Sequence, residues 1–180
     1  ELKKNPKSTI IYNLISSKTV PEVIAENKGV AVRSRVGHSY IKNLMAETGA
    51  IFAGEHSGHF YFKNFWKADS GMLAALYALA ELMNTDKTLS ELLQPYNRYF
   101  SSGEINSKVK NSQKSIMAIK KKYEGKHQID ELDGLTISTD QWWFNLRASN
   151  TEPLLRLNVE ADTPKLMAKI RDEVLTQIKR

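Results

Sequence analysis

Residues 29–55, GVAVRSRVGHSYIKNLMAETGAIFAGE, decide the fold because they place a helix pattern between two strand patterns. The valine-rich run at 29–35 is typical of a buried strand. The stretch at 38–49 has helical character and ends at Gly49, a residue type that commonly terminates helices. The apolar run at 50–55 is a further strand pattern. A strand, a helix and a strand in succession predict parallel pairing of the strands, with the helix on one face of the sheet.

The residues on either side continue this alternation. Residues 9–15, TIIYNLI, indicate a strand, and residues 19–27 indicate a helix with a proline in its first turn. Residues 69–84 are rich in alanine and leucine and predict a long helix, capped by Asp69 or Ser70, whose apolar side chains lie in the core. The first half of the chain is therefore expected to be an α/β domain, with a mainly parallel sheet flanked by helices.

A change of composition near residue 100 predicts a domain boundary. A second helix precedes it, with Thr88 and Glu91 at the spacing of a capping box. The polar and glycine-containing residues 101–103 then interrupt the pattern. We therefore expect one domain at 1–102 and another at 103–180.

The second half predicts a small α+β domain. Consecutive strands with short connections favour an antiparallel sheet with helices on one face. In a regular strand, one of the neighbouring Trp142 and Trp143 must face away from the other. The expected strands are 104–110, 134–140, 142–149 and 154–161, and the expected helices are 113–123 and a last one opened by Thr163 and Pro164.

The composition is that of an ordinary globular protein, with 41% hydrophobic and 26% charged residues among 180. No apolar run approaches the roughly 18 residues that a membrane helix needs, and the first residues lack the apolar core of a signal peptide, so we expect a cytoplasmic protein without membrane contact. The absence of cysteine excludes disulfides and thiolate zinc sites. The net charge of +6 is compatible with nucleic acids or with anionic small molecules such as sugar phosphates.

The loop GEHSGH, residues 54–59, gathers polar groups where a strand is about to begin. Glycines at 54 and 58 allow close approach of a ligand, and the Glu55 carboxylate could accept hydrogen bonds from two neighbouring sugar hydroxyls. Ser57 could add one more contact. An ordinary, well-bonded turn explains the same composition equally well. His56 and His59 do not indicate a metal site, because a glycine-broken loop does not place them on one face and no third ligand is evident.

The stretch RASNTEPLLR, residues 147–156, lies between two predicted strands. The Arg147 guanidinium and the short donors that follow it suit a phosphate dianion, and Arg156 could reach the same anion from the next strand. The alternative is an ordinary turn with both arginines at the surface.

A third polar stretch, RSRVGHSYIK, places Arg33 and Arg35 at the end of a strand and His38 at the start of a helix. In a parallel sheet this is the carboxyl end, where open α/β folds bind ligands. His38 could carry a proton near neutral pH, or it could be only a helix cap or a surface histidine.

Taken together and in this order, GEHSGH, RVGHSYIK and WWFNLRASNTEPLLRLNVEA resemble the C-terminal half of the α-D-phosphohexomutases, and most closely their bacterial phosphomannomutase/phosphoglucomutase branch. The resemblance covers nearly the whole chain. It implies the third and fourth domains of a four-domain enzyme that moves a phosphoryl group between the 1 and 6 positions of a hexose, through a hexose 1,6-bisphosphate.

The resemblance also implies residue roles. Sugar hydroxyls would be bound by Glu55 and Ser57, with Gly54, Gly58 and His59 shaping the loop. The phosphate that does not react would be held by Arg147, Ser149, Asn150 and Thr151, with Arg156 in support. His38 matches a histidine that is a candidate acid/base. Asn150 stands where phosphoglucosamine mutases usually have glycine, which favours mannose or glucose as the sugar.

Two motifs of the family are missing from this sequence: the loop with the phosphorylated serine, and the aspartate-rich loop that holds Mg²⁺. The sequence therefore resembles an excised half of a mutase whose partners are hexose phosphates and the N-terminal domains 1 and 2. Because phosphoryl transfer depends on positioning and on neutralising charge, we expect this chain to bind hexose phosphates without turning them over.

Two other functions are compatible with parts of the sequence. The same loops could serve a free-standing, non-catalytic sugar-phosphate-binding protein. Nucleic-acid binding would draw on the basic charge and on the similarity of the family's fourth domain to a TATA-binding protein. Fold similarity does not transfer function, however, and no basic stripe with exposed aromatic residues is visible, so no nucleic-acid partner is expected.

Overall fold

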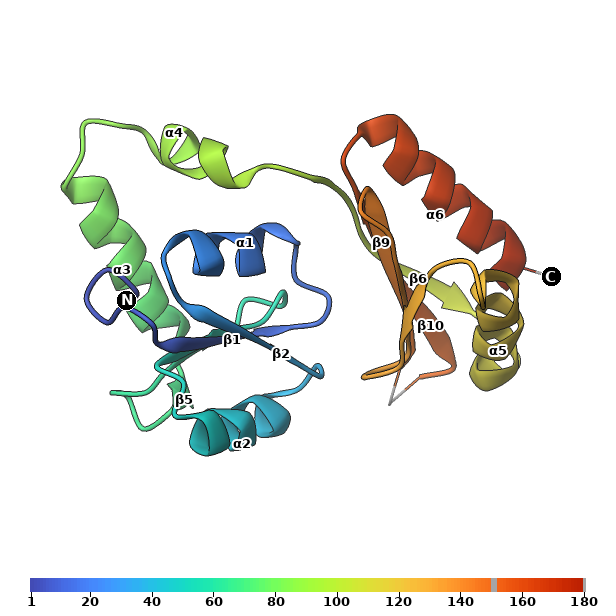
Figure 1. Cartoon of the computed structure of the whole chain (residues 1–180), viewed down its shortest axis with the longest axis horizontal. Helices are drawn as coiled ribbons and strands as arrows, with labels where there is room; N and C mark the ends of the chain where they lie inside the picture. Colours follow the sequence, from blue (N-terminus) through green and yellow to red (C-terminus); the bar gives the residue numbers. More distant parts are fainter. Residues whose placement is uncertain (150–151, 180) are drawn as a thin grey trace. The chain divides into compact units, whose positions relative to one another are not determined.

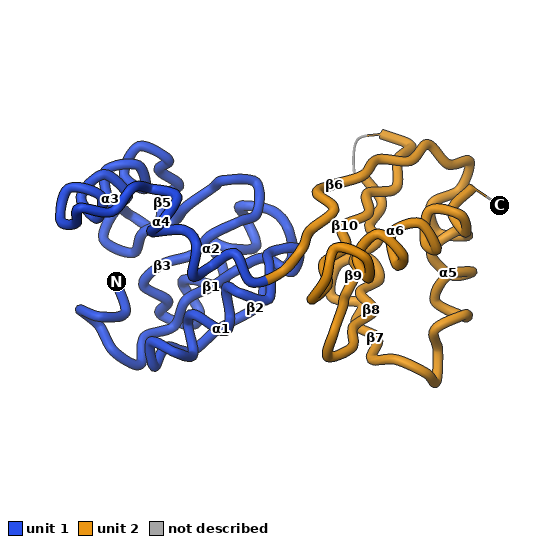
Figure 2. The backbone as a smooth tube through the Cα atoms, turned by 90° about the horizontal axis from the view of Figure 1, so that it is seen from above, with its two compact units in different colours: residues 1–98 blue, residues 99–180 orange. Residues whose placement is uncertain are grey.

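The computed structural model describes residues 1–149 and 152–179, which form two compact units, 1–98 and 99–180. Figure 2 shows the two units in different colours. The division falls slightly before the predicted boundary, because residues 101–103 belong to the first strand of unit 2 rather than to a linker.

The sheet of unit 1 is mixed. Its strand order is β2-β1-β3-β4-β5. The parallel pairs β1 with β2 and β1 with β3 confirm the predicted parallel arrangement, and two short antiparallel strands extend it beyond β3. The strands are β1 (Thr9–Asn13), β2 (Val30–Ser34), β3 (Phe52–Gly54), β4 (Phe60–Phe62) and β5 (Ala68–Asp69).

Two helices cover opposite faces of this sheet, α1 (Thr19–Glu26) and α2 (His38–Thr48) (Figure 1). From α2, Ile41 and Met45 are fully buried against Ile11 of β1 and the neighbouring core. The α2 helix ends as predicted, because the following glycine at 49 takes the left-handed conformation that an αL helix cap requires.

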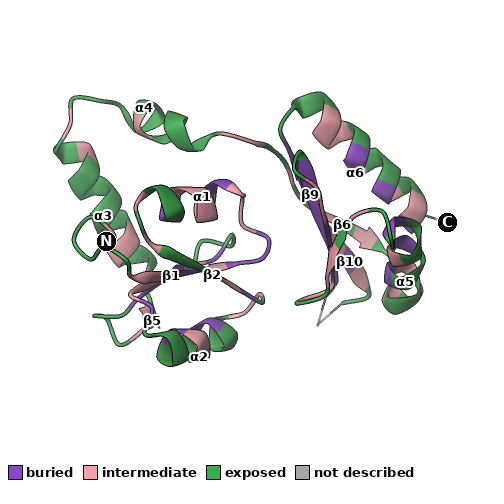
Figure 3. Ribbon diagram, in the orientation of Figure 1, coloured by how far each residue is buried: buried purple, intermediate pink, exposed green. Residues whose placement is uncertain are grey.

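The third helix, α3 (Gly71–Met83), forms where it was predicted and begins at Ser70, whose hydroxyl accepts a hydrogen bond from the Leu73 amide at 3.1 Å. The prediction that its apolar side chains lie in the core is wrong, because none of its residues is buried. Figure 3 shows α3 in the exposed colour along much of its length. The helix is apolar on more than one side, and its own unit faces only one of them.

A short helix, α4 (Leu89–Leu93), confirms the predicted capping box. The Thr88 hydroxyl accepts a hydrogen bond from the Glu91 amide, and the Glu91 carboxylate accepts one from the Thr88 amide at 2.7 Å. A 3-10 turn, η1 (Gln94–Tyr96), then leads to the end of unit 1.

Unit 2 is built on an antiparallel sheet with the order β6-β10-β9-β8-β7, which confirms the predicted α+β architecture. Its helices are α5 (Ser112–Tyr123) and α6 (Pro164–Ile178), and α6 is capped by the Thr163 hydroxyl as predicted. The strands are β6 (Phe100–Lys108), β7 (Gln128–Asp130), β8 (Leu135–Ser138), β9 (Trp142–Ala148) and β10 (Leu154–Ala161).

The alternation along β9 and β10 separates an apolar face from a polar one. Trp142, Phe144 and Leu157 belong to the hydrophobic core that includes the buried residues of α5 and α6. Trp143 lies on the other face, as the alternation predicts, and its indole NH donates to the Glu160 carboxylate at 2.9 Å. We call the face that carries Trp143, Asn145, Arg147, Arg156, Asn158 and Glu160 the polar face of unit 2.

Candidate functional site

The loop at 54–59 is a closed turn between β3 and β4. The Glu55 amide donates to the His59 carbonyl at 2.9 Å, and the Gly58 amide donates to the Glu55 carbonyl at 3.0 Å. Gly58 has φ +86°, in the left-handed region that favours glycine. Ser57 and His59 are exposed on this turn, so a ligand could reach both.

Glu55 is buried under this turn and joins two other segments to it. One carboxylate oxygen accepts a hydrogen bond from the Tyr61 hydroxyl at 2.7 Å, and the other accepts one from the Gly37 amide at 3.1 Å. Burial, reinforced by the bond to Glu55, raises the pKa of Tyr61, so that its hydroxyl stays a donor. A carboxylate has about four acceptor positions. Glu55 therefore holds the loop in place and keeps capacity to accept further hydrogen bonds.

Asn13 holds the same loop from the carboxyl end of β1. Its side chain is fully buried, and its carbonyl oxygen accepts hydrogen bonds from the Ser16 hydroxyl at 2.7 Å and the His56 amide at 3.3 Å. Its amide nitrogen has no partner among the described residues. A buried amide without a partner is costly, so a ligand or a water at this position would be favoured.

His59 forms a close pair with Asp69. Its Nδ1 lies 2.6 Å from one carboxylate oxygen of Asp69, and the other oxygen accepts a hydrogen bond from the Phe60 amide at 2.9 Å. The bond to Asp69 raises the pKa of His59. Burial acts to raise the pKa of Asp69, but the bonds from His59 and Phe60 outweigh it and lower that pKa. Nε2 of His59 has no partner among the described residues, so it is the ring atom that can give or take a proton.

Asp69→Asn is expected to shift the titration of His59. The substitution removes the carboxylate charge, so the pKa of His59 should fall towards its ordinary value. Because the pKa is raised in the folded protein, the pair stabilises the fold fully below the ordinary histidine pKa of about 6.5, and this stabilisation is lost as the pH rises through the raised value. An NMR titration of the His59 ring protons measures the shift.

The matched control is Asp86→Asn, which removes the same charge from an exposed position in the same unit. The titration midpoint of His59 should stay unchanged in that variant. An equal midpoint in the Asp69→Asn variant and in the unsubstituted chain would show that the two side chains do not form the pair in solution.

His38 lies at the start of α2, exposed, one residue after the glycine whose amide bonds to Glu55. The structure thus brings the beginning of α2 to the loop at 54–59, as expected for the carboxyl ends of neighbouring parallel strands. Arg35 stacks over the ring of Tyr40 at 4.7 Å. Stacking of this kind holds the guanidinium of Arg35 against the first turn of α2. The acid/base role of His38 stays a prediction.

The second group of predicted residues lies on the polar face of unit 2. Arg147 and Arg156 are direct partners in the antiparallel pair β9 with β10, so their side chains leave the sheet side by side. Arg156 lies 3.4 Å from the Glu104 carboxylate. Each arginine has an Nε buried without a partner among the described residues. Two like charges directly opposite destabilise a sheet, whereas an anion bound between them would remove the repulsion.

The remaining predicted phosphate contacts follow β9. The Ser149 amide donates to the Leu154 carbonyl at 2.9 Å, which closes the connection to β10. Asn150 and Thr151 lie outside the described residues.

The backbone beneath Arg147 is closely packed. Gly134, at φ +73°, lies so near that an added Cβ would stand 2.5 Å from the Leu146 carbonyl oxygen and 2.9 Å from the Arg147 Cα. The turn before β8 therefore fixes the strand position from which Arg147 extends.

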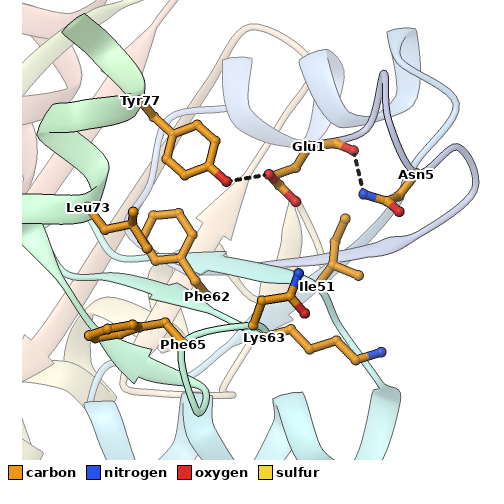
Figure 4. Close-up of a pocket in the computed structure, with 9 residues that line it drawn as sticks. Glu1, Asn5, Ile51, Phe62, Lys63, Phe65, Leu73 and Tyr77 are labelled. Carbon is orange, nitrogen blue, oxygen red and sulfur yellow. Dashed lines mark hydrogen bonds between the residues drawn. The ribbon is translucent and has the colours of Figure 1, made fainter. Parts of the chain in front are cut away.

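A small pocket in unit 1 is not this site. It has a volume of about 230 Å³, and the Tyr77 hydroxyl donates to the Glu1 carboxylate at 2.8 Å on its wall (Figure 4). Ile51 and Phe62 line it at the amino end of β3, whereas the loop at 54–59 follows the opposite, carboxyl end.

Two structural findings concern residues 1–149 and 152–179. No group of three or more His, Cys, Asp or Glu side chains among them is placed to hold a metal ion. None of the helices there combines the length and the apolar character that crossing a membrane requires.

Sequence reasoning missed three residues of the site. Asn13 could have been found by the argument applied to His38, because it also ends a strand of the parallel sheet. The sequence pattern indicates Asp69 only as a possible helix cap and gives no signal that singles out Tyr61. Their contacts with His59 and Glu55 depend on the antiparallel pairing of β3, β4 and β5, which the sequence pattern did not indicate.

Comparison with known proteins supports the reading of both units. Residues 1–99 match the family described as phosphoglucomutase/phosphomannomutase, alpha/beta/alpha domain III, and residues 104–177 match its C-terminal domain. A phosphomannomutase of Methanocaldococcus jannaschii is 47% identical over 173 residues, which cover 96% of this chain and 38% of that protein. A phosphomannomutase of Escherichia coli is 39% identical, with 99% of this chain and 40% of that protein covered.

A solved structure agrees. The crystal structure of a phosphoglucomutase/phosphomannomutase family protein from Burkholderia thailandensis superposes with a TM-score of 0.84 at 30% identity, over 99% of this chain and 38% of that one. The chain thus spans about two fifths of the length of the relatives it matches. Its two units correspond in order to the two matched domains. The predicted resemblance is confirmed, and the chain belongs to the phosphoglucomutase/phosphomannomutase family, of which it contains domain III and the C-terminal domain.

Proposed function

We propose that this chain supplies the hexose-phosphate binding residues of a phosphohexomutase, an enzyme that interconverts hexose 1-phosphate and hexose 6-phosphate, with mannose or glucose as the sugar. The observation that carries the proposal is the pair of facing arginines, Arg147 and Arg156, with buried Nε groups that lack partners among the described residues. Such a pair favours a dianion with the size and charge of a phosphate.

In this proposal the two units bind different parts of the ligand. Domain III binds the sugar hydroxyls through the loop at 54–59, and the C-terminal domain binds the phosphate that does not react. The sugar contacts are Gly54, Glu55, Ser57, Gly58 and His59; the phosphate contacts are Arg147, Ser149, Asn150, Thr151 and Arg156.

In this proposal, a histidine at or beside the loop at 54–59 of domain III transfers the proton. Nδ1 of His59 faces the Asp69 carboxylate, so Nε2 is the ring atom that can accept or release a proton at a sugar hydroxyl bound to the turn. His38 remains a second candidate acid/base, because the start of α2 reaches Glu55 through the Gly37 amide. Both histidines are exposed, so a ligand could reach either.

The rest of the reaction belongs, in this proposal, to domains 1 and 2 of a full-length member. Those domains would supply the phosphorylated serine and the residues that hold Mg²⁺, which stabilises the charge of the transferred group. Hexose 1,6-bisphosphate would be the intermediate of the complete enzyme. The isolated chain is expected to bind hexose phosphates without mutase activity. We place the protein in the cytoplasm, in agreement with its lack of cysteine.

The test is an NMR titration of this chain with mannose 6-phosphate, with inorganic phosphate and free mannose as separate additions. Both phosphates should shift amide signals around Arg147 and Arg156, and the sugar phosphate should also shift those of Glu55 and Ser57. Arg147→Ala should weaken binding of inorganic phosphate about tenfold to a hundredfold, the range for a hydrogen bond to a charged group.

Arg171→Ala is the matched control, because Arg171 is a surface arginine on α6 that pairs with the neighbouring Asp172. It should leave the affinity for phosphate unchanged. The absence of saturable shifts in both loops would refute the proposal. If both substitutions weaken phosphate binding equally, the binding depends on the overall positive charge and not on a site at Arg147.

A further inference from the structure

The α3 helix has two apolar sides with different surroundings. One side carries alanines and lines a groove of about 850 Å³ inside unit 1, together with Phe52 and Phe60 of the sheet. The groove-lining residues of this helix are Gly71, Ala74, Ala75, Tyr77, Ala78 and Glu81.

The other side carries an exposed row of large apolar side chains, which we call the apolar seam: Met72, Leu76, Leu79 and Met83. They are 80%, 57%, 53% and 86% exposed. Their spacing of four, three and four residues places them in one line along the helix. The angular step of 100° per residue puts this line about 120° around the helix from the alanines that face the groove. The apolar seam therefore points away from the core of its own unit.

A helix that is apolar on both sides is normally buried on both. Aligned, exposed large apolar side chains mark an interaction surface, whereas scattered ones need no explanation. The Ser70 cap shows that α3 is a formed helix and not a fraying end. The apolar seam thus lacks a partner among the described residues of unit 1.

The area that an interface needs indicates which partner covers the apolar seam. The α3 helix has 13 residues and is about 20 Å long. Specific interfaces between separate proteins bury about 1,200 Å² or more, so the seam alone is too short to hold two copies of this chain in a stable dimer. A segment of the same polypeptide needs no such area, because the connection supplies a high effective concentration. The relatives are about two and a half times as long as the region matched here, and its first half matches their domain III.

We propose that the apolar seam of α3 is the surface on which the part of a full-length phosphohexomutase that precedes domain III packs. The inference rests on the proposed function, because it takes this chain to be a region of such an enzyme. It adds the surface, and it assigns α3 to interdomain packing rather than to the core of its own domain.

The test compares methionine oxidation in two proteins. The first is this chain, and the second is the Methanocaldococcus jannaschii phosphomannomutase with its matching region replaced by this chain. In the isolated chain Met72 and Met83 should react as fast as Met117, which is 68% exposed on α5. In the full-length chimera they should slow to the rate of the fully buried Met45, while Met117 stays reactive.

Each other result overturns the inference. Equal reactivity of Met72 and Met83 in both proteins means that nothing covers the seam. Protection already present in the isolated chain means that its own unit covers it, or a second copy if dilution removes the protection. Mutase activity of the chimera with mannose 1-phosphate is measured separately, so that an inactive chimera with a protected seam counts against the proposed function alone.

Fast oxidation of the buried Met45 would show that the chimera does not fold, and a second measurement then tests the inference. The double variant Leu76→Glu, Leu79→Glu should leave the melting temperature of the isolated chain nearly unchanged, because both side chains are more than half exposed there. In a folded chimera the same variant should lower it. A fall in the melting temperature of the isolated chain would overturn the inference by itself.

Discussion

Replacement of Glu55 by alanine is expected to destabilise unit 1 by about 2–4 kcal/mol and to remove the sugar-dependent part of ligand binding. The substitution leaves the Tyr61 hydroxyl and the Gly37 amide without their shared acceptor. A buried polar group that loses its partner costs about 1–3 kcal/mol, and two groups are affected. Denaturant unfolding of unit 1 measures the first effect, and the difference in affinity between mannose 6-phosphate and inorganic phosphate measures the second.

Glu47→Ala provides the control, because Glu47 is an exposed glutamate on α2 in the same unit. It should change stability and ligand binding little. The variant Tyr61→Phe separates the two losses, since it removes one donor and leaves the carboxylate in place. If Glu55→Ala unfolds at the same denaturant concentration as Glu47→Ala, Glu55 does not join the loop to α2 and β4 in solution.

Replacement of Gly134 by alanine is expected to destabilise unit 2 by about 2–5 kcal/mol and to abolish phosphate binding. The new Cβ would stand 2.5 Å from the Leu146 carbonyl oxygen, a distance that real Cβ atoms do not tolerate, and φ +73° adds backbone strain. Strain and overpacking each cost about 1–3 kcal/mol. Because the new Cβ clashes with the backbone of β9, the strand must shift to relieve the clash, and this shift moves Arg147. Amide signals of β9 during denaturation and a phosphate titration measure the two effects.

Gly125→Ala is the matched control. Gly125 has φ +71°, but an added Cβ there meets no atom within 4 Å. The control therefore carries the same backbone strain without the clash, and about 1–2 kcal/mol is expected from it. Equal destabilisation by the two substitutions would show that β9 does not lie against the turn at Gly134.

The sequence patterns predicted most of the elements because local signals and tertiary contacts agree at those positions. The helix at 38–49 ended at its glycine, and Thr88, Glu91 and Thr163 formed the expected caps. The short strands β4, β5 and β7 were not delimited in advance, because two or three residues give no measurable alternation. Their pairing with neighbouring strands determines them instead.

The long helix α3 shows where pattern reasoning fails. Alanine and leucine content predicted both the helix and its burial, but composition cannot say which neighbour covers which side. The candidate site shows the same limit. Chemistry and chain position identified Glu55 and Arg147, whereas the supporting Asn13 and Asp69 emerged only from contacts between elements distant in the chain.

The strand order of unit 2 also bears on how the protein forms as it is synthesised. The first strand, β6, pairs with the last, β10, and one helix and three strands lie between them in the chain. In unit 1, by contrast, β1 pairs with the two parallel strands that follow it most closely. Pairing of strands far apart in the chain costs loop-closure entropy before the contacts that stabilise the pair can form. On the ribosome unit 1 can therefore be complete early, while β6 emerges as an unpaired strand that is open to aggregation until β10 has been made.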